Sequence, residues 1–289
     1  MEIVSKQVVH VIKADGASEP FNVAKLQQSL KRAGATKQEV TDIVTSVEAV
    51  IHDGMHTQEI YRHAFELLRE SGAPVSARYS MRRALFGLGP TGFPFEDFLA
   101  RIFSHEGYKT KTRVYLKGKC AEHELDVAAY KPDHSFVAEA KFHSRPGMKS
   151  DLQVALYSYA RLIDLKDARI CSDDTCGIKE LLLVTNTKFT SAAEKYATCA
   201  GVTLLSWEYP KDNNLHDRIQ AAGIYPVTVL QTLSQSQKQA LIGFGAITTE
   251  DVIAKPALLR HLHISPKRME AVIAEARGLE KPSTKQLKS

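Results

Sequence analysis

The chain has 289 residues, of which 44% are hydrophobic and 25% charged, and its formal net charge is +5. This composition is ordinary for a globular protein with room for two or three domains, and the mild positive charge permits nucleic-acid binding without demonstrating it. No apolar run is long enough to span a bilayer, and the first residues lack the hydrophobic region of a signal peptide. We therefore expect a cytoplasmic protein with no membrane partner.

Four cysteines, at positions 120, 171, 176 and 199, are sparse and irregularly spaced. Cys171 and Cys176 have the spacing of half of a zinc site, but no second pair of ligands follows them. We expect free thiols in a reducing cytosol in preference to a structural zinc ion.

The first segment, about residues 1–88, combines a predicted hairpin with predicted helices. Alternating apolar residues flank Ala14-Asp15-Gly16, which predicts two strands joined by a turn. A short helix is predicted from about Ser76 to Phe86, and the glycine-rich residues 87–92 form the expected linker. Three earlier helices are indicated by apolar stripes that end near glycines: Leu26, Leu30 and Ala33; Val40, Ile43, Val44, Val47 and Ile51; Ile60, Ala64, Phe65 and Leu68.

The central segment, from Phe93 to about Tyr225, has a mixed pattern. The predicted order α-β-β-β-α-β-α-β indicates a mixed sheet flanked by helices. Strands are expected at about 112–116, 124–130, 135–142, 180–185 and 202–207, and helices around 95–103, after Pro146-Gly147 to about Leu165, and at 191–200.

The third segment, about residues 227–289, is predicted to be all-helical. Thr248 to Asp251 has the pattern of a capping box, and Ser265-Pro266 supplies a helix cap followed by proline at the first helical position. The polar end, GLEKPSTKQLKS, is expected to be frayed.

Two strand-like runs in the central segment carry three charged residues suited to catalysis. The run Phe136–His143 alternates with the period of a strand, which places Glu139 and Lys141 on one face and apolar residues on the other. Asp126 occupies a similar run just before it. Charges are costly to bury in mid-strand without a partner, so this placement favours a site. Asp126 and Glu139 would hold Mg²⁺ or Mn²⁺, and Lys141 would orient the attacking water in phosphodiester hydrolysis.

A simpler interpretation is a salt-bridged pair on an exposed sheet face. In the helix that follows, Gln153, Tyr157 and Arg161 recur at intervals of four and share a face, which either contacts a phosphate backbone or is merely solvated. We favour a functional role for Gln153, which lies nearest the strand end. The expected core stripe of this helix is Leu152, Ala155, Leu156, Tyr159 and Ile163.

The stretches GPTGFPFEDFLARIFSHEGY, EHELDVAAY, AEAKFH and LQVALYSYARLID resemble the Mrr-like restriction endonuclease catalytic domain of the PD-(D/E)xK superfamily, over about residues 89–207. The resemblance implies a catalytic set of Glu96, Asp126, Glu139, Lys141 and Gln153, with the metal at Asp126 and Glu139. An acidic residue at the position of Glu96 is also explained by the dipole of its helix.

The stretches VIKADGASEPFNVAKL, DGMHTQEI and ARYSMRRAL resemble, in order and spacing, the ATP-cone, the nucleotide-sensing module of ribonucleotide reductases and their transcriptional repressor. Ala14 stands where the family usually has a second basic residue. The alternative is a cone kept only for packing or oligomerisation. The resemblance implies that ATP or dATP is surrounded by Lys13, Glu19, Asn22, Lys25, His56, Thr57 and Arg78.

The stretch LIGFGAITTEDVIAKPALLRHLHISPKRMEAVIAEAR resembles tandem helix-hairpin-helix modules of DNA-processing proteins. Residues Gly243 to Gly245 would then present backbone N–H groups to a phosphate. Leu262-His263-Ile264 stands where the second hairpin should have glycine, and a structural or self-associating bundle is the alternative.

These observations predict a multidomain α+β and α/β protein. Its domains would be an ATP-cone with a β-hairpin and helices (residues 1–88), a restriction-endonuclease-like mixed sheet flanked by helices (89–226), and an all-helical domain (227–289). We expect a Mg²⁺- or Mn²⁺-dependent DNA endonuclease that responds to ATP or dATP and forms homo-oligomers. The alternative is a nucleotide-responsive DNA-binding regulator with an inactive nuclease fold.

Overall fold

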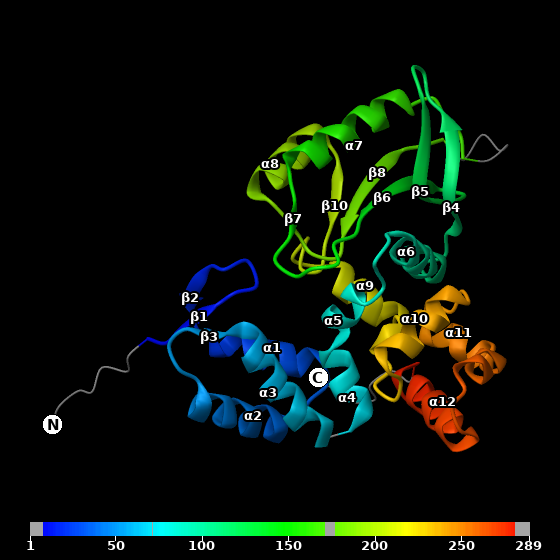
Figure 1. The fold of residues 1–289 in the computed structure, drawn as a ribbon. Coiled ribbons are helices and arrows are strands. Elements are labelled where there is room, and N and C mark those ends of the chain that lie inside the picture. The colour runs from blue at the N-terminus through cyan, green and yellow to red at the C-terminus, as the bar shows by residue number, and fades with distance from the viewer. Residues whose placement is uncertain (1–7, 71, 171–176, 281–289) are drawn as a thin grey trace. The chain divides into compact units, whose positions relative to one another are not determined.

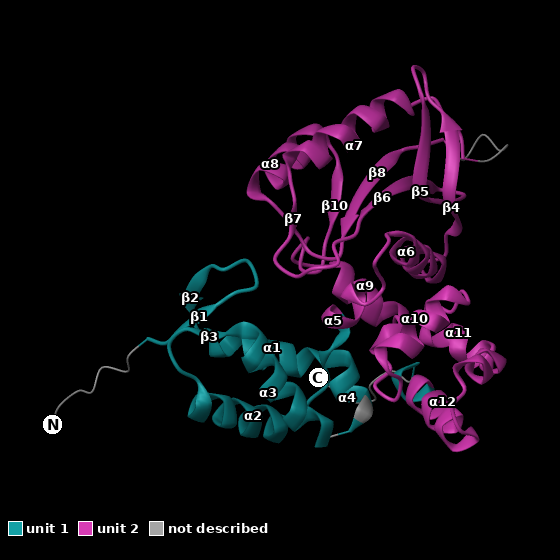
Figure 2. Cartoon of the chain, in the orientation of Figure 1, with its two compact units in different colours: residues 1–81, 277–289 teal, residues 82–276 magenta. Residues whose placement is uncertain are grey.

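The computed structural model describes residues 8–70, 72–170 and 177–280, and the chain divides into two compact units (Figures 1 and 2). Unit 1 is Met1–Met81 with Arg277–Ser289, and unit 2 is Arg82–Ala276. No helix in the described ranges has the length and apolar character needed to cross a membrane.

Unit 1 contains a three-stranded sheet in the order β2-β1-β3. Strands β1 (His10–Ile12) and β2 (Ser18–Pro20) pair antiparallel, which confirms the predicted hairpin. Its turn includes Gly16 at φ +82°, a left-handed conformation that glycine adopts without a steric penalty. The third strand, β3 (Met55–His56), pairs parallel with β1. It has only two residues, too few to show the alternation of apolar and polar residues that identifies a strand in a sequence.

The predicted helices of unit 1 are confirmed as α1 (Val23–Arg32), α2 (Lys37–Val50) and α3 (Thr57–Glu70), and their leucine, isoleucine and valine stripes form the core of the unit. The single helix predicted from Ser76 to Phe86 is wrong. Two helices occupy this range, α4 (Ala73–Tyr79) and α5 (Met81–Phe86). The break falls at Ser80, whose hydroxyl donates to the carbonyl of Ala77 at 2.8 Å. A serine hydroxyl that donates to a backbone carbonyl of the preceding turn competes with the backbone hydrogen bonds of the helix.

Unit 2 is built on a five-stranded mixed sheet, as predicted, and its strands lie in the order β10-β8-β6-β5-β4. Strands β4, β5 and β6 pair antiparallel, whereas β6, β8 and β10 run parallel. The bounds are β4 Lys109–Lys117, β5 Glu122–Lys131, β6 His134–Lys141, β8 Glu180–Thr185 and β10 Thr203–Leu205.

Helices cover both faces of this sheet (Figure 1). Helix α6 (Phe93–His105) packs on one face, where Phe103 meets Phe136 of β6 edge-on at 5.0 Å. Helices α7 (Leu152–Asp164) and α8 (Ser191–Ala200) cover the other. Because both faces are covered, β6 is buried from Ser135 to Glu139.

The predicted strand through Phe142 ends one residue earlier, at Lys141. The ring of Phe142 turns toward the glycine-rich segment before α6, and a Cβ on Gly89 would lie 2.8 Å from it. A larger residue at position 89 would therefore require the Phe142 ring to shift. A further two-stranded parallel sheet, β7 (Lys149–Ser150) with β9 (Lys188–Phe189), was not predicted.

The C-terminal part is helical, as predicted, and much of it belongs to unit 2. Its elements are α9 (Leu215–Ala222), η2 (Val227–Val229), α10 (Gln235–Gly243), α11 (Thr249–Ala254), η3 (Pro256–Leu262) and α12 (Pro266–Glu280). The capping box at Thr248 and Asp251 is confirmed, and the Ser265 hydroxyl accepts from the N–H of Arg268. Asp251 also binds Arg101 of α6 at 3.1 Å, which ties the helices to the sheet layer. The division into domains 1–88, 89–226 and 227–289 stays a prediction.

The expectation that residues Gly243 to Gly245 present free N–H groups to a phosphate is wrong. The N–H of Phe244 donates to the carbonyl of Ala240, and the N–H of Gly245 to that of Ile242. These donors close the end of α10. At the second hairpin His263 takes φ +51°, the left-handed conformation for which the pattern expects glycine.

Cys120 and Cys199 are free and exposed. The Cys171 and Cys176 pair and most of the expected frayed end, from Lys281 onward, lie outside the described residues.

Candidate metal centre and nucleotide-sensing site

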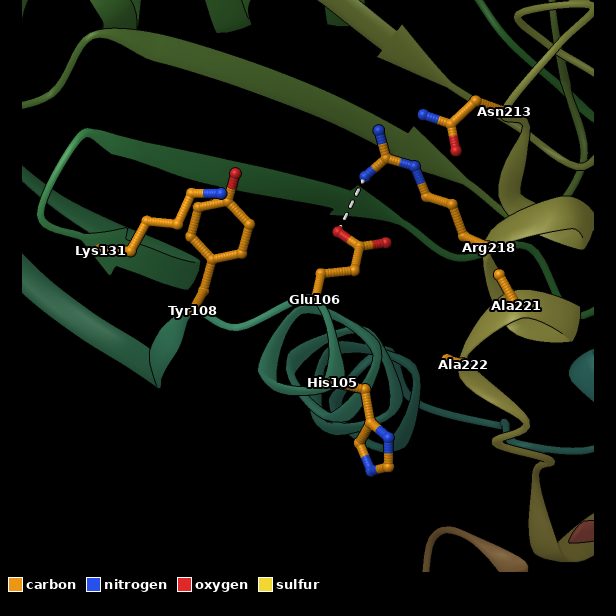
Figure 3. Close-up of a pocket in the computed structure, with 8 residues that line it drawn as sticks. All are labelled: His105, Glu106, Tyr108, Lys131, Asn213, Arg218, Ala221 and Ala222. Atoms are coloured by element: carbon orange, nitrogen blue, oxygen red, sulfur yellow. Dashed lines mark hydrogen bonds and ion pairs between the residues drawn. The ribbon is translucent and has the colours of Figure 1, made fainter.

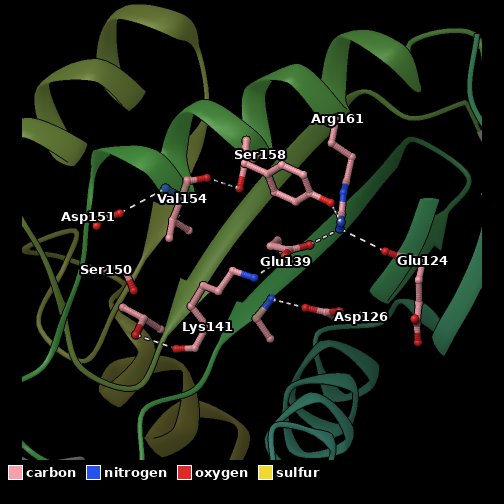
Figure 4. A network of polar contacts seen from close by, with 12 residues as sticks. Glu124, Asp126, Glu139, Lys141, Ser150, Asp151, Val154, Ser158 and Arg161 are labelled. Carbon is pink, nitrogen blue, oxygen red and sulfur yellow. Dashed lines mark hydrogen bonds and ion pairs between the residues drawn. The ribbon is translucent and has the colours of Figure 1, made fainter. Parts of the chain in front are cut away.

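Strands β5 and β6 bring the three predicted catalytic side chains together (Figure 4). Asp126 lies on β5, and its Oδ2 accepts from the backbone N–H of Ala140 on β6 at 2.7 Å. Ala140 is flanked on β6 by Glu139 and Lys141, and Lys141 Nζ donates to Glu139 Oε1 at 2.7 Å. The hydrogen bond from Ala140 therefore fixes Asp126 beside this acid–lysine pair.

Glu139 is buried, with a side chain only 5% exposed, and it lies between two cations. Lys141 binds one carboxylate oxygen, and Arg161 Nη1 binds the other in a very short ion pair. Arg161 also donates to the carbonyl of Glu124 at 3.0 Å and to the hydroxyl of Tyr157 at 2.6 Å. The salt bridge considered from the sequence is present, but Glu139 is buried, with only the Lys141 side of the pair partly exposed, so the pair does not lie on an exposed sheet face.

The acids of the site crowd one another. Burial, and then the charge of Glu139, raises the pKa of Asp126 to about 6. Burial, and then the charge of Asp126, raises the pKa of Glu96 to about 7 against the opposing effect of Arg113. The charged forms of both acids are disfavoured, so an added cation would stabilise them.

Glu96 lies in the first turn of α6, where Arg113 binds it at 3.3 Å and binds Asp97 at 2.8 Å. Arg113 has φ +54°. Strands β4 and β5 pair residue by residue on either side of it, but Arg113 itself does not pair with Asp126, the residue at the opposite position of β5. Left-handed backbone at a residue other than glycine is strained, and such strain is concentrated at functional sites. No pattern in the sequence marks Arg113.

The predicted faces of α7 are partly wrong. Leu156 and Ile163, expected in the core, are 43% and 55% exposed, whereas Arg161, expected on the polar face, is buried. The inward stripe is formed by Ala155, Ser158, Arg161 and Leu165. The ion pair with Glu139 accounts for this rotation, since it draws Arg161 toward the sheet.

Gln153 is exposed in the first turn of α7. In the described structure it makes no hydrogen bond with Asp126, Glu139 or Lys141, so its assignment to the site stays a prediction. Tyr157 is 52% exposed, with its ring 4.7 Å from the guanidinium of Arg161.

A buried polar cluster that the sequence did not predict fixes the end of β6. Asn186 and the backbone of His143 exchange hydrogen bonds of 2.9 and 2.8 Å, and the Thr185 hydroxyl donates to the carbonyl of Lys141 at 2.8 Å. His143 also contacts the Ser150 hydroxyl at 3.1 Å. Burial and the charge of Lys141 lower the pKa of His143. The cluster holds the backbone of Lys141 in place.

The sheet of unit 1 gathers several residues of the predicted nucleotide site. Glu19 of β2 forms ion pairs with Lys13, just after β1, and with Lys25 of α1 at 3.7 Å. The hydrogen bond from Lys13 is the main cause of the lowered pKa of Glu19. His56 ends β3 beside Ile12 of β1, so it lies at the same end of the sheet as Lys13.

Of the other residues in the predicted nucleotide site, Asn22 and Thr57 lie at helix N-termini, and Arg78 lies farther along the chain. Asn22 caps α1 by accepting from the N–H of Lys25 at 3.1 Å, and Thr57 begins α3. Arg78 lies in α4, which packs against α1 and α3. The assignment of all seven residues to a nucleotide site stays a prediction.

Comparison with known proteins gives matches at both ends of the chain. Residues 9–85 match the ATP cone domain, and residues 225–280 match the AF1548-like C-terminal domain. An uncharacterized protein of Archaeoglobus fulgidus is 34% identical over 180 residues, which are 62% of this chain and 98% of that relative. The chain belongs to the AF1548-like family.

A solved crystal structure is also similar to this chain. The crystal structure of the protein of unknown function AF1548 is 31% identical and covers 66% of this chain and 98% of its own, with a TM-score of 0.52. The ATP cone match supports nucleotide binding by the N-terminal region of this AF1548-like protein. The Mrr-like nuclease resemblance of its central sheet stays a prediction.

Proposed function

We propose that this protein is a Mg²⁺- or Mn²⁺-dependent DNA endonuclease regulated by ATP or dATP. The observation that carries the proposal is the meeting of Asp126, Glu139 and Lys141 on β5 and β6, with Glu139 buried against Lys141. The resemblance of this stretch to the Mrr-like catalytic domain supports the same chemistry. The metal, the activity and the DNA substrate are all part of the proposal.

The donor set suits a small, hard cation. Across the described residues no three histidine, cysteine or acidic side chains are grouped to hold a metal ion. Mg²⁺ does not require such a group, because one or two carboxylates together with water and substrate phosphate are its usual ligands. Asp126 and Glu139 fit that role, since burial, and then the charge of Glu139, raises the pKa of Asp126 and disfavours its charged form without a cation. When bound, the metal would act as a Lewis acid at the scissile phosphate.

The neighbouring residues would then have distinct tasks. Lys141, held by Glu139, would orient the attacking water and offset negative charge that develops on the phosphate. Glu96 would assist by holding a proton near neutral pH, given its pKa of about 7. Gln153, exposed at the start of α7, would contact the DNA backbone.

Plasmid cleavage tests the proposal. Purified full-length protein is incubated with supercoiled plasmid and Mg²⁺ or Mn²⁺, and nicked and linear products are followed by gel electrophoresis. We expect metal-dependent cleavage that Asp126→Asn and Glu139→Gln each abolish and that Lys141→Met slows by about 10²–10³-fold. Asp133→Asn is the matched control, because Asp133 is an exposed acid in the turn between β5 and β6. Undiminished cleavage by any of the three site variants rejects the site.

The ion pair of Arg161 with Glu139 favours a second candidate, a nucleotide-responsive DNA-binding regulator with an inactive nuclease fold. A guanidinium on one Glu139 oxygen, with Lys141 on the other, engages both oxygens that a metal would use. The regulator would bind DNA and leave plasmid intact with either metal. Cleavage by wild-type protein that Asp126→Asn removes would exclude this candidate.

The C-terminal helices are the proposed additional DNA contact. Lys255, Arg260 and Lys267 are exposed there. Changing all three to glutamine should weaken binding equally across DNA sequences. The slope of log affinity against log salt concentration should fall by the equivalent of up to about three phosphate contacts. An unchanged salt slope would assign these helices to scaffolding or self-association.

The cone is proposed to regulate the nuclease through homo-oligomer assembly. ATP or dATP can shift the assembly equilibrium only by the ratio of its affinities for the two assembly states, which is typically about 5- to 150-fold. Sedimentation and cleavage rate should both change with nucleotide, and Lys13→Ala with Lys25→Ala should remove the response while the fold persists. If calorimetry detects no binding of either nucleotide, the cone has only a structural role.

A further inference from the structure

A concave site lies in unit 2, at the end of β5 and β6 away from Lys141. A cavity of about 450 Å³ opens beside Lys131, the last residue of β5, which pairs with His134 at the start of β6 (Figure 3). Along α6, Glu96 is in the first turn and Glu106 caps the C-terminal end. Ten helical residues span about 15 Å, so this cavity is separate from the proposed metal centre.

The cavity has more positive than negative charge. Lys131 lies on one side and Arg218 on the other, with Glu106 between them (Figure 3). Arg218 Nη1 binds Glu106 Oε2 at 3.3 Å. Burial raises the pKa of Glu106, while the charges of Arg218 and Lys131 oppose that change. One carboxylate faces two cations, so an added anion would be attracted.

Both cations have unused binding capacity. Arg218 Nε is buried and has no hydrogen-bond partner in the described structure. Lys131 Nζ lies 4.5 Å from the centre of the Tyr108 ring, and no described carboxylate is within ion-pair distance of it. Within the described residues the guanidinium of Arg218 hydrogen bonds only through Nη1, to Glu106, which leaves Nη2 as the donor for an added anion.

The remaining lining is mixed, with polar His105 and Asn213 beside apolar groups. The Tyr108 ring and the methyl groups of Ala221 and Ala222 complete the cavity. Its volume is within the range of pockets that hold small ligands. A guanidinium fork and an ammonium group suit a phosphate, and an aromatic face suits a planar ring.

We infer that this cavity binds a phosphate monoester with a planar body, the size of a mononucleotide. Lys131 and Arg218 would hold the phosphate; Lys131 would turn from the Tyr108 ring to do so, and the ring would then pack against the planar body. A free mononucleotide and the 5′-phosphorylated end of a DNA strand share this chemistry. The inference does not depend on the proposed metal centre or on cleavage.

Calorimetry on the full-length protein tests this inference. The protein carries Lys13→Ala and Lys25→Ala, so that the predicted cone site does not contribute. The probes are inorganic phosphate, dAMP, deoxyadenosine, and a short single-stranded oligonucleotide with and without a 5′-phosphate. We expect dAMP to bind more tightly than inorganic phosphate, and deoxyadenosine not to bind.

Two variants on different elements locate the binding. Arg218→Gln and Lys131→Gln should each weaken dAMP binding by about tenfold or more. Lys188→Gln removes one positive charge from a half-exposed pair with Glu208 and should leave binding unchanged. Lys131→Gln keeps the test decisive if Arg218→Gln fails to fold, because Lys131 is the partly exposed last residue of β5.

Two outcomes would overturn the inference. One is no detectable binding of dAMP or of the 5′-phosphorylated oligonucleotide up to about 10 mM. The other is binding that neither Arg218→Gln nor Lys131→Gln weakens. A preference for dAMP or for the phosphorylated oligonucleotide identifies the source of the phosphate, and either preference supports the site.

Discussion

Two regions of the molecule place one carboxylate between two cations, but in different surroundings. In unit 1 Glu19 lies between Lys13 and Lys25, with side chains 30%, 37% and 68% exposed. In unit 2 Glu139 lies between Lys141 and Arg161, with side chains 5%, 35% and 9% exposed. Both regions place a carboxylate between two cations, but the groups in unit 1 are more exposed to solvent than those in unit 2.

This difference determines how readily each region can exchange partners. Exposed ion pairs contribute little to stability, so Lys13 and Lys25 can exchange Glu19 for a nucleotide phosphate at low cost. A buried pair is hard to break from one side, because the remaining charge has neither water nor a partner. We therefore expect a readily reversible ligand site in unit 1 and a rigid, preorganised centre in unit 2.

The largest expected effect is on stability, from removing the buried guanidinium. Arg161→Met should lower the free energy of unfolding of unit 2 by about 3 kcal/mol, because Glu139 keeps only Lys141 as a partner. Lys13→Met, which breaks an exposed pair, should cost under about 1 kcal/mol. Urea denaturation measures both. Equal losses would contradict the contrast between buried and exposed pairs.

The next effect concerns catalysis. Lys141→Met should reduce the single-turnover rate of plasmid cleavage by about 10²–10³-fold, since a cation near the developing charge is lost. Metal binding should be largely retained, because Lys141 is not a proposed ligand. Lys188→Met, which removes an exposed ammonium elsewhere in unit 2, is the control. A rate equal to that of wild type would remove Lys141 from the mechanism.

A smaller effect is the pH dependence of stability without metal. Asp126 and Glu96 have folded-state pKa values of about 6 and about 7, above their ordinary values of 3.8 and 4.5. The folded state therefore binds more protons, and stability is lost as pH rises from about 4 to 7. Asp126→Asn should be the more stable protein above pH 7, by on the order of 2 kcal/mol, and no more stable near pH 4.

Thermal unfolding at pH 4, 6 and 8, without divalent metal, measures this effect. Mg²⁺ should raise the melting temperature of wild type at pH 8 and leave Asp126→Asn unchanged. If Asp126→Asn is the less stable protein at pH 8, Asp126 is not under the burial and charge repulsion that raise its pKa.

The smallest effect is expected at the cone. The lowered pKa of Glu19 means that its ion pairs stabilise the fold above pH 4.5, and that this contribution is lost as pH falls below it. Glu19→Gln should cost under about 1 kcal/mol at pH 7, and about 1 M NaCl should reduce that cost further. A cost that salt does not change would indicate that Glu19 is effectively buried.

Elements with a strong period could be predicted from the sequence. The bounds predicted for β8 (Glu180–Thr185) and α8 (Ser191–Ala200) agree with the structure, because a continuous apolar run and a capped helix leave clear signals. Strands β3, β7 and β9 have two residues each and show no period. Their pairing depends on contacts distant in sequence, which a local pattern does not encode.

The grouping of three charged residues on β5 and β6 could be predicted from the sequence, but their interactions with other elements could not. Asp126, Glu139 and Lys141 stood out as charges within apolar strands, and the structure brings them together. Arg161 was placed on a polar helix face, because its partner Glu139 lies on another element. Arg113 could not be found, since its strained backbone follows from the β4–β5 pairing opposite Asp126.

Metal binding at Asp126 and Glu139 is the central claim, and a Mn²⁺ titration of the full-length protein followed by electron paramagnetic resonance tests it most directly. Wild type and Asp133→Asn should each bind Mn²⁺ without DNA, and Asp126→Asn should lose that binding. Arg161→Met should bind Mn²⁺ more tightly than wild type, because one oxygen of Glu139 is released. No Mn²⁺ binding by wild type, or binding that Asp126→Asn leaves unchanged, would contradict the account.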